Sequence, residues 1–145
     1  EIAYRQVLRS GALEPGVAGL VRALLSQELE HVATLERELG GLGTSLPAAP
    51  TSPAAAQLAL AGHHVSVSLT RLATQHQCLK LLIDVESLAE GAYFSAISQL
   101  SDPALLRTST EIMGAEAQHW TILSATQHHG AVDRAVPYPY VQGSS

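Results

Sequence analysis

Two stretches of this chain place a glutamate three residues before a histidine. Glu28 and His31 form one pair, and Glu116 and His119 form the other. Positions i and i+3 are neighbours on one face of a helix, so both side chains of a pair can reach one ion while the carboxylate bridges to a second. Carboxylate oxygen and imidazole nitrogen suit iron, manganese or zinc, and the lack of thiolate ligands disfavours a structural zinc site. The two pairs therefore predict a metal site.

The acidic and imidazole side chains fall on the apolar stripes of three helical patterns. These stripes are Leu24, Glu28, His31 and Leu35, then Leu82, Glu86, Tyr93 and Ile97, then Ile112, Glu116, His119 and Leu123. Carboxylates that share an interior repel one another unless a cation or protons neutralise them. Chance predicts roughly 0.5 Glu-x-x-His pairs in a chain of this composition, so two pairs on core stripes, with Glu86 between them, favour a metal. A buried hydrogen-bonded network without metal is the alternative.

Helix signals along the chain explain how these residues would be positioned. The first part of the chain predicts the end of a helix over 1–11 and a helix from Pro15 to Gly40. A linker over 41–53 and a short helix over 54–61 follow, and then a segment over 63–71 whose alternation is compatible with an extended strand. The last two predicted helices cover 75–100, capped by Thr74, and Pro103 to about Gly130, capped by Asp102. The two halves also read alike, since Ala-Tyr, a proline turn and Glu-x-x-His recur in each. We therefore expect two helical hairpins joined by a long connection.

Composition narrows the class of protein. The chain of 145 residues is 46% hydrophobic and carries a formal net charge of −5, without a cluster of lysine or arginine. Nucleic-acid binding therefore is not expected, and no apolar run approaches the roughly 18–20 residues that span a bilayer. The chain begins inside an apparent helix, so we expect residues upstream of Glu1; a targeting signal there would decide the compartment, which the sequence shown leaves open.

The paired motifs, the intervening Glu86 and the two hairpins resemble the ferritin-like superfamily, specifically the bacterial ferritin-like domain proteins often found in actinobacteria. The resemblance implies an all-α four-helix bundle over residues 1–132, with a first helix truncated at its N-terminus, a long crossover between the second and third helices, and an irregular tail over 133–145. It also implies two metal ions, iron first with manganese or zinc as alternatives, held by one Glu from each of two helices and Glu-x-x-His from each of the other two.

Residue by residue, the resemblance implies five metal ligands: Glu28, His31, Glu86, Glu116 and His119. Glu28 and Glu116 would bridge or chelate, each histidine would bind one ion, and Glu86, seven before Tyr93, would be a terminal ligand. The first helix departs from the pattern, because the position seven before Tyr4 lies outside the chain and Glu1 is only three before it. The remaining ligand is either upstream or replaced by Glu1.

Other polar residues have simpler interpretations. Glutamates 14, 36, 38 and 111 are expected to be solvated, the pairs His63-His64 and His128-His129 to lie at the surface or in loops, and Cys78 to be a buried core residue. Tyr4 and Tyr93 would either donate hydrogen bonds to metal-bound carboxylates or pack in the core.

Two functions fit the sequence. The first is a di-metal protein that handles iron, with ferroxidase or with oxygen- or peroxide-linked oxidoreductase activity, as the resemblance implies. The second is a metal-free structural or interaction subunit that keeps the bundle, forms a homo-oligomer or docks on another protein. A hydrolase is disfavoured because no Gly-x-Ser-x-Gly elbow occurs.

Overall fold

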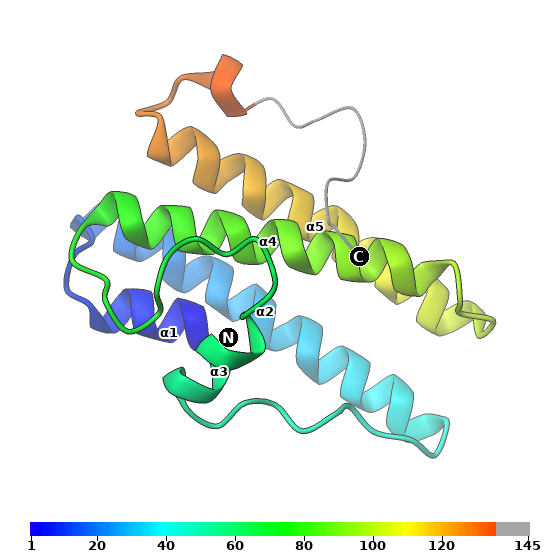
Figure 1. The fold of residues 1–145 in the computed structure, drawn as a ribbon. Helices are drawn as coiled ribbons and strands as arrows, with labels where there is room; N and C mark the ends of the chain where they lie inside the picture. The colour runs from blue at the N-terminus through cyan, green and yellow to red at the C-terminus, as the bar shows by residue number, and fades with distance from the viewer. Residues whose placement is uncertain (136–145) are drawn as a thin grey trace.

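The computed structural model describes residues 1–135, apart from the side chain of Val132, and shows a bundle of α-helices (Figure 1). The elements are α1 (Ile2–Arg9), α2 (Pro15–Gly41), α3 (Pro53–Ala59), α4 (Gln75–Ile97), α5 (Pro103–Gln127) and the short 3-10 helix η1 (Val132–Ala135). No β-strand occurs within 1–135. The predicted all-α fold class is confirmed.

The bundle consists of two helical hairpins and a long connection between them. A short turn joins α1 to α2, another joins α4 to α5, and residues 42–74 cross from one hairpin to the other and contain α3 (Figure 1). The pair α4 and α5 has the most extensive contact, while α2 packs on α5 and α1 packs on both α2 and α4. Leucine and valine side chains fill the interior, chiefly Val7, Val21, Leu24, Leu79, Leu81, Leu82 and Leu123.

Side-chain caps begin the two helices of the second hairpin, as the sequence predicts. Oγ1 of Thr74 accepts the backbone N–H of Gln77 at 3.2 Å. Oδ1 of Asp102 accepts the N–H groups of Ala104 and Leu105 at 3.0 and 2.9 Å. These contacts satisfy amide donors that have no partner within the helix, and they fix where α4 and α5 start.

The end of α4 was predicted three residues too late. The helix ends at Ile97 rather than Leu100, because the backbone tightens into i+3 hydrogen bonds there: the N–H of Gln99 donates to the carbonyl of Ala96 at 2.8 Å. The hydroxyl of Ser98 also donates to the carbonyl of Ser95 at 2.8 Å. Such local bonds compete with the continuing α-helix.

The alternating segment over 63–71 forms turns rather than a strand. No neighbouring strand among residues 1–135 offers a hydrogen-bonding edge, so side chains satisfy its backbone instead. The N–H of Leu69 donates to Oε1 of Gln57 at 2.7 Å, and the N–H of Ser66 donates to Oδ2 of Asp84 at 3.3 Å. The alternation reflects packing on the helices, since Leu69 is buried in the core.

The described part of the chain ends with η1, whose Ala135 is buried. Residues 133–135, which were predicted to belong to an irregular tail, lie in this 3-10 helix, and the rest of the predicted tail, residues 136–145, lies outside the described residues. Within residues 1–135 we find no helix with both the length and the apolarity that crossing a membrane requires.

Removing the cap of α5 should destabilise the bundle measurably. The variant Asp102→Ala leaves two backbone N–H groups without their acceptor, so we expect the free energy of unfolding to fall by about 1 kcal/mol. Urea unfolding followed by circular dichroism measures this difference. Asp102→Asn keeps an oxygen acceptor and should stay close to the wild-type protein; equal stability of Asp102→Ala and the wild type would show that the cap contributes nothing.

Candidate metal centre

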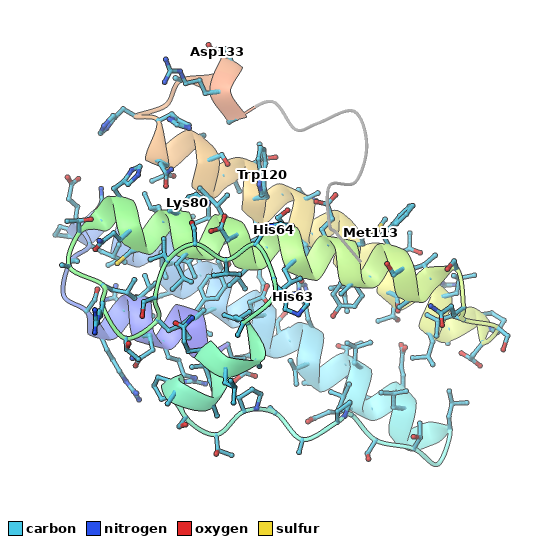
Figure 2. The ribbon with its side chains drawn as sticks, in the orientation of Figure 1. His63, His64, Lys80, Met113, Trp120 and Asp133 are labelled. Carbon is cyan, nitrogen blue, oxygen red and sulfur yellow. The ribbon has the colours of Figure 1, made fainter. Side chains whose placement is uncertain are left out.

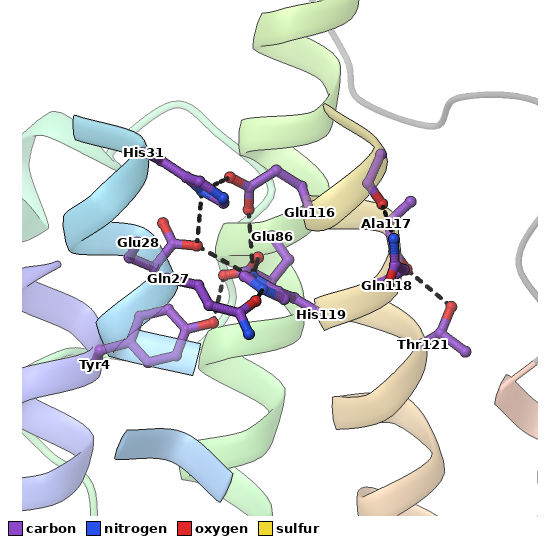
Figure 3. Close-up of polar contacts among 11 residues, drawn as sticks. Tyr4, Gln27, Glu28, His31, Glu86, Glu116, Ala117, Gln118, His119 and Thr121 are labelled. Carbon is purple, nitrogen blue, oxygen red and sulfur yellow. Dashed lines mark hydrogen bonds and ion pairs between the residues drawn. The ribbon is translucent and has the colours of Figure 1, made fainter. Parts of the chain in front are cut away.

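The five predicted ligands converge in the middle of the bundle (Figure 3). Glu28 and His31 come from α2, Glu86 comes from α4, and Glu116 and His119 come from α5. Four of them, all except His31, offer ligand atoms that lie within 4.8 Å of one another. Glu86, Glu116 and His119 are only 1–2% exposed. The helical periodicity therefore predicted correctly which side chains point inward, and their role as ligands stays a prediction.

His119 lies at the centre of the cluster. Its Nδ1 is 3.1 Å from Oε2 of Glu86 and 3.1 Å from Oε1 of Glu28. Oε2 of Glu116, one helical turn away on α5, is 3.8 Å from the same nitrogen. One imidazole nitrogen thus faces carboxylates from three helices.

His31 forms the second imidazole of the site. Its Nδ1 is 3.3 Å from Oε1 of Glu116 and 3.7 Å from Oε1 of Glu28. Its ring stacks on that of His119, with 5.9 Å between centroids and 16° between planes. The side chains of His31 and Glu28 are each 16% exposed, so the site approaches solvent along α2.

Tyr4 connects α1 to the cluster. Its hydroxyl donates a 2.7 Å hydrogen bond to Oε1 of Glu86, and its side chain is fully buried. Burial, followed by the charge of Glu86 and the hydrogen bond to it, raises the pKa of this phenol far above its usual value. Tyr4 therefore stays a neutral donor that orients Glu86, as one of the two sequence interpretations proposed. Tyr93 is half-buried on α4, and burial also raises its pKa.

Several buried polar atoms of the cluster have no hydrogen-bond partner. These are Oε1 of Glu28, Nδ1 of His31 and Oε2 of Glu116. Oε1 of Glu28 lies 3.1 Å and Oε2 of Glu116 lies 3.8 Å from Nδ1 of His119, but neither contact is a hydrogen bond. Leaving such groups unsatisfied costs about 1–3 kcal/mol each, and more when they are charged. Oxygen and nitrogen atoms directed at a shared interior are what a divalent cation requires, so this donor set fits a metal.

In the metal-free cluster, protonation partly relieves the repulsion between the carboxylates. Burial raises the pKa of Glu116 to about 7, with the neighbouring Glu86 adding to the shift and the contact with His31 opposing it. For His119, burial alone would lower the pKa, but the carboxylates of Glu28, Glu86 and Glu116 outweigh it and raise the pKa to about 10. Without a metal, the site therefore retains protons that the same groups would lose in water.

These pKa values predict how the stability of the metal-free protein depends on pH. A pKa that is higher in the folded state means that folding is favoured while the group is protonated. The contribution of Glu116 is lost as pH rises from about 4.5 to 7, and that of His119 is lost between about 6.5 and 10. We expect the melting temperature in excess chelator to fall by on the order of 5–10 °C between pH 5 and pH 9. A flat or rising profile in circular-dichroism melts would contradict these shifts.

The sequence did not predict the contacts that two residues of α2 make with α5. Gln27, which sequence reasoning missed, places Oε1 2.7 Å from Nε2 of His119; a glutamine on a helix carries no pattern that would single it out. Glu38 was expected to be solvated, and that prediction is wrong. It is half-buried, because Oε1 accepts a 2.6 Å hydrogen bond from Thr108 across the α2–α5 contact. The other three glutamates of that group are exposed.

The remaining candidates lie away from the cluster. Figure 2 shows His63 and His64 on the connection between the hairpins, and both are exposed. Cys78 is buried in the core, as predicted, with Oγ of Ser10 at 3.4 Å. Glu1 is exposed, and its carboxylate lies 3.7 Å from Arg5. Glu1 is thus engaged at the surface rather than at the cluster, and a remaining ligand upstream of it stays a prediction.

Comparison with known proteins gives one match. The family described as the ferritin-like domain matches residues 2–129, which include all five converging side chains. Searches among curated proteins and solved structures found no match to the chain.

Proposed function

The chain belongs to the ferritin-like domain family, and we propose that its buried carboxylate–imidazole cluster binds two divalent metal ions, iron first, and supports oxidation of that metal. The observation that carries this proposal is the set of buried oxygen and nitrogen atoms that lack hydrogen-bond partners at Glu28, His31 and Glu116. A cation would satisfy these atoms and remove the repulsion between the carboxylates. Manganese or zinc would suit the same donors.

Each residue of the cluster would have a distinct part in this site. Glu28 extends from α2 and Glu116 from α5, and each lies near both imidazoles, which suits them to bridge or chelate the ions. His31 and His119 would each bind one ion through Nδ1, the nitrogen that faces the carboxylates. Glu86, oriented by Tyr4, would be a terminal ligand.

A bound pair of iron ions would supply electrons for the reduction of dioxygen or peroxide. The protein would orient the ligands, balance the charge of the ions and give iron access to the site. The hydrogen bond from Tyr4 fixes Glu86, and the nearly complete burial of Glu116 and His119 limits water around the ions. The partial exposure of Glu28 and His31 gives ferrous iron a way in along α2.

The metal-free structural subunit remains the alternative. In its favour, a protonated His119 forms ion pairs with Glu28 and Glu86, so part of the cluster neutralises itself. Large apolar side chains are also exposed at separate places, with Leu58 on α3 76% and Phe94 on α4 55% accessible, and in such a subunit they would contact a second copy or another protein. Elemental analysis of the purified protein, with its size in solution, separates the two functions.

The direct test adds ferrous iron without oxygen and then admits air. We expect about two ions per chain to bind and to be oxidised on exposure to air, as followed by absorbance and by loss of a ferrous-specific dye signal. Glu116→Ala should abolish both steps. Failure of the wild-type protein to bind ferrous iron, together with identical behaviour of Glu116→Ala, would remove this proposal and leave the structural subunit.

A further inference from the structure

The two nitrogen atoms of His119 meet different partners. Nδ1 faces the carboxylates of Glu28 and Glu86. Nε2 faces the opposite way and lies 2.7 Å from Oε1 of Gln27 (Figure 3). Gln27 directly precedes Glu28 on α2, so two consecutive residues of one helix contact opposite edges of the same ring. The ring itself is only 2% exposed, whereas Gln27 lies on the exposed side of α2.

We propose that Gln27 is a positioning residue, which accepts the Nε2–H of His119 and thereby directs the lone pair of Nδ1 at the metal-binding cluster. This inference rests on the proposed metal site. A metal-binding imidazole commonly donates its other N–H to an acceptor that fixes the ring and its tautomer, and loss of such an acceptor weakens metal binding about 10–100-fold. The neutral amide of Gln27 can do this without adding another negative charge to the three carboxylates.

The direction of this hydrogen bond follows from the atoms at the two edges of the ring. Before a metal binds, Nδ1 can remain 3.1 Å from Oε2 of Glu86 only as a proton donor. On the other edge, the atom of Gln27 that lies 2.7 Å from Nε2 is the amide oxygen, which can only accept. Nε2 therefore carries the proton of this hydrogen bond. When a metal takes the place of the Nδ1 proton, the Nε2–H bond to Gln27 remains in place.

The opposite amide orientation has different consequences. If Gln27 presented its NH₂ group, Nε2 would be the acceptor and the single proton would stay on Nδ1. No lone pair would then face Glu28 and Glu86, and metal binding would require the ring to change its tautomer first. The two orientations are therefore distinguishable by the protonation of Nε2.

The test compares Gln27→Leu, which removes the acceptor, with Gln27→Glu, which keeps an oxygen at that position. Ser26→Ala, an exposed neighbour on α2, is the matched control. Zinc affinity is measured by competition with a chromophoric chelator. Nitrogen-15 correlation spectra of the histidine rings are recorded for both the metal-free and the zinc-loaded proteins.

We expect Gln27→Leu to bind zinc about 10–100-fold more weakly than the wild type, with Gln27→Glu and Ser26→Ala within about threefold of it. The His119 Nε2–H signal should be visible in the wild type and in Gln27→Glu, and lost to solvent exchange in Gln27→Leu. Unchanged zinc affinity in Gln27→Leu, or an unprotonated Nε2 in the wild type, overturns the inference while the metal site stands. If the wild type binds no zinc, the proposed function fails, and the spectra of the metal-free proteins still decide whether Gln27 holds the Nε2–H.

Discussion

Glu116→Gln is expected to change the stability of the metal-free protein and its metal affinity in opposite directions. The carboxyl group is 1% exposed, and its pKa is raised to about 7 by burial first and by Glu86 second. Above pH 8 the folded protein therefore contains an unfavourable buried charge, which glutamine removes with almost the same shape. We expect the metal-free variant to be more stable by roughly 1–3 kcal/mol at pH 8. Urea unfolding in excess chelator measures this gain.

The same substitution should remove most of the metal affinity. Glutamine offers a neutral oxygen in place of a carboxylate that lies between both imidazoles, so we expect zinc or manganese to bind more weakly by at least roughly 100-fold. Glu111→Gln, at an exposed position on the same helix, is the matched control and should change neither property. If Glu116→Gln is less stable than the wild type in excess chelator, or binds zinc as tightly as the wild type, Glu116 is an ordinary core residue.

Saturating divalent metal should stabilise the wild-type bundle strongly. The ions would connect α2, α4 and α5 through Glu28, Glu86 and His119, and the unfolded chain has no such preformed site. At a free concentration 100 to 1,000 times the dissociation constant, the free energy of unfolding should increase by about 3–4 kcal/mol. Chelator should reverse the effect completely. Thermal melts with and without manganese or zinc measure it.

Surface histidines could also bind added metal, and a control is needed for them. His63 and His64 are exposed neighbours on the connection between the hairpins. The double variant His63→Asn, His64→Asn should keep the full metal-dependent increase in melting temperature, whereas Glu116→Gln should lose it. The reverse pattern would locate the bound metal at the surface.

The helical spacing of the polar residues predicted most of the site. The spacing of Glu28 and His31 within one stripe, and of Glu116 and His119 within another, is a property of the sequence because a helix repeats every 3.6 residues. The caps at Thr74 and Asp102 were equally readable, since each depends on residues within three positions of the cap. Local chemistry of this kind needs no knowledge of the partner helix.

Contacts between distant parts of the chain could not be predicted from the sequence in this way. The hydrogen bond of Gln27 with His119 and that of Thr108 with Glu38 each cross from α2 to α5, so their existence depends on how those helices pack. The segment over 63–71 has strand-like alternation, yet it forms turns because helices rather than strands surround it. Tertiary packing overrides local pattern at such positions.

Anomalous diffraction from crystals grown with manganese or iron tests most directly whether the converging side chains form a metal centre. We expect two peaks about 3.5–4 Å apart, surrounded by Glu28, His31, Glu86, Glu116 and His119, and their loss in crystals of Glu116→Gln. Absence of any peak in the bundle interior at saturating metal, with the five side chains still converging there, would contradict the proposal and favour a metal-free structural role.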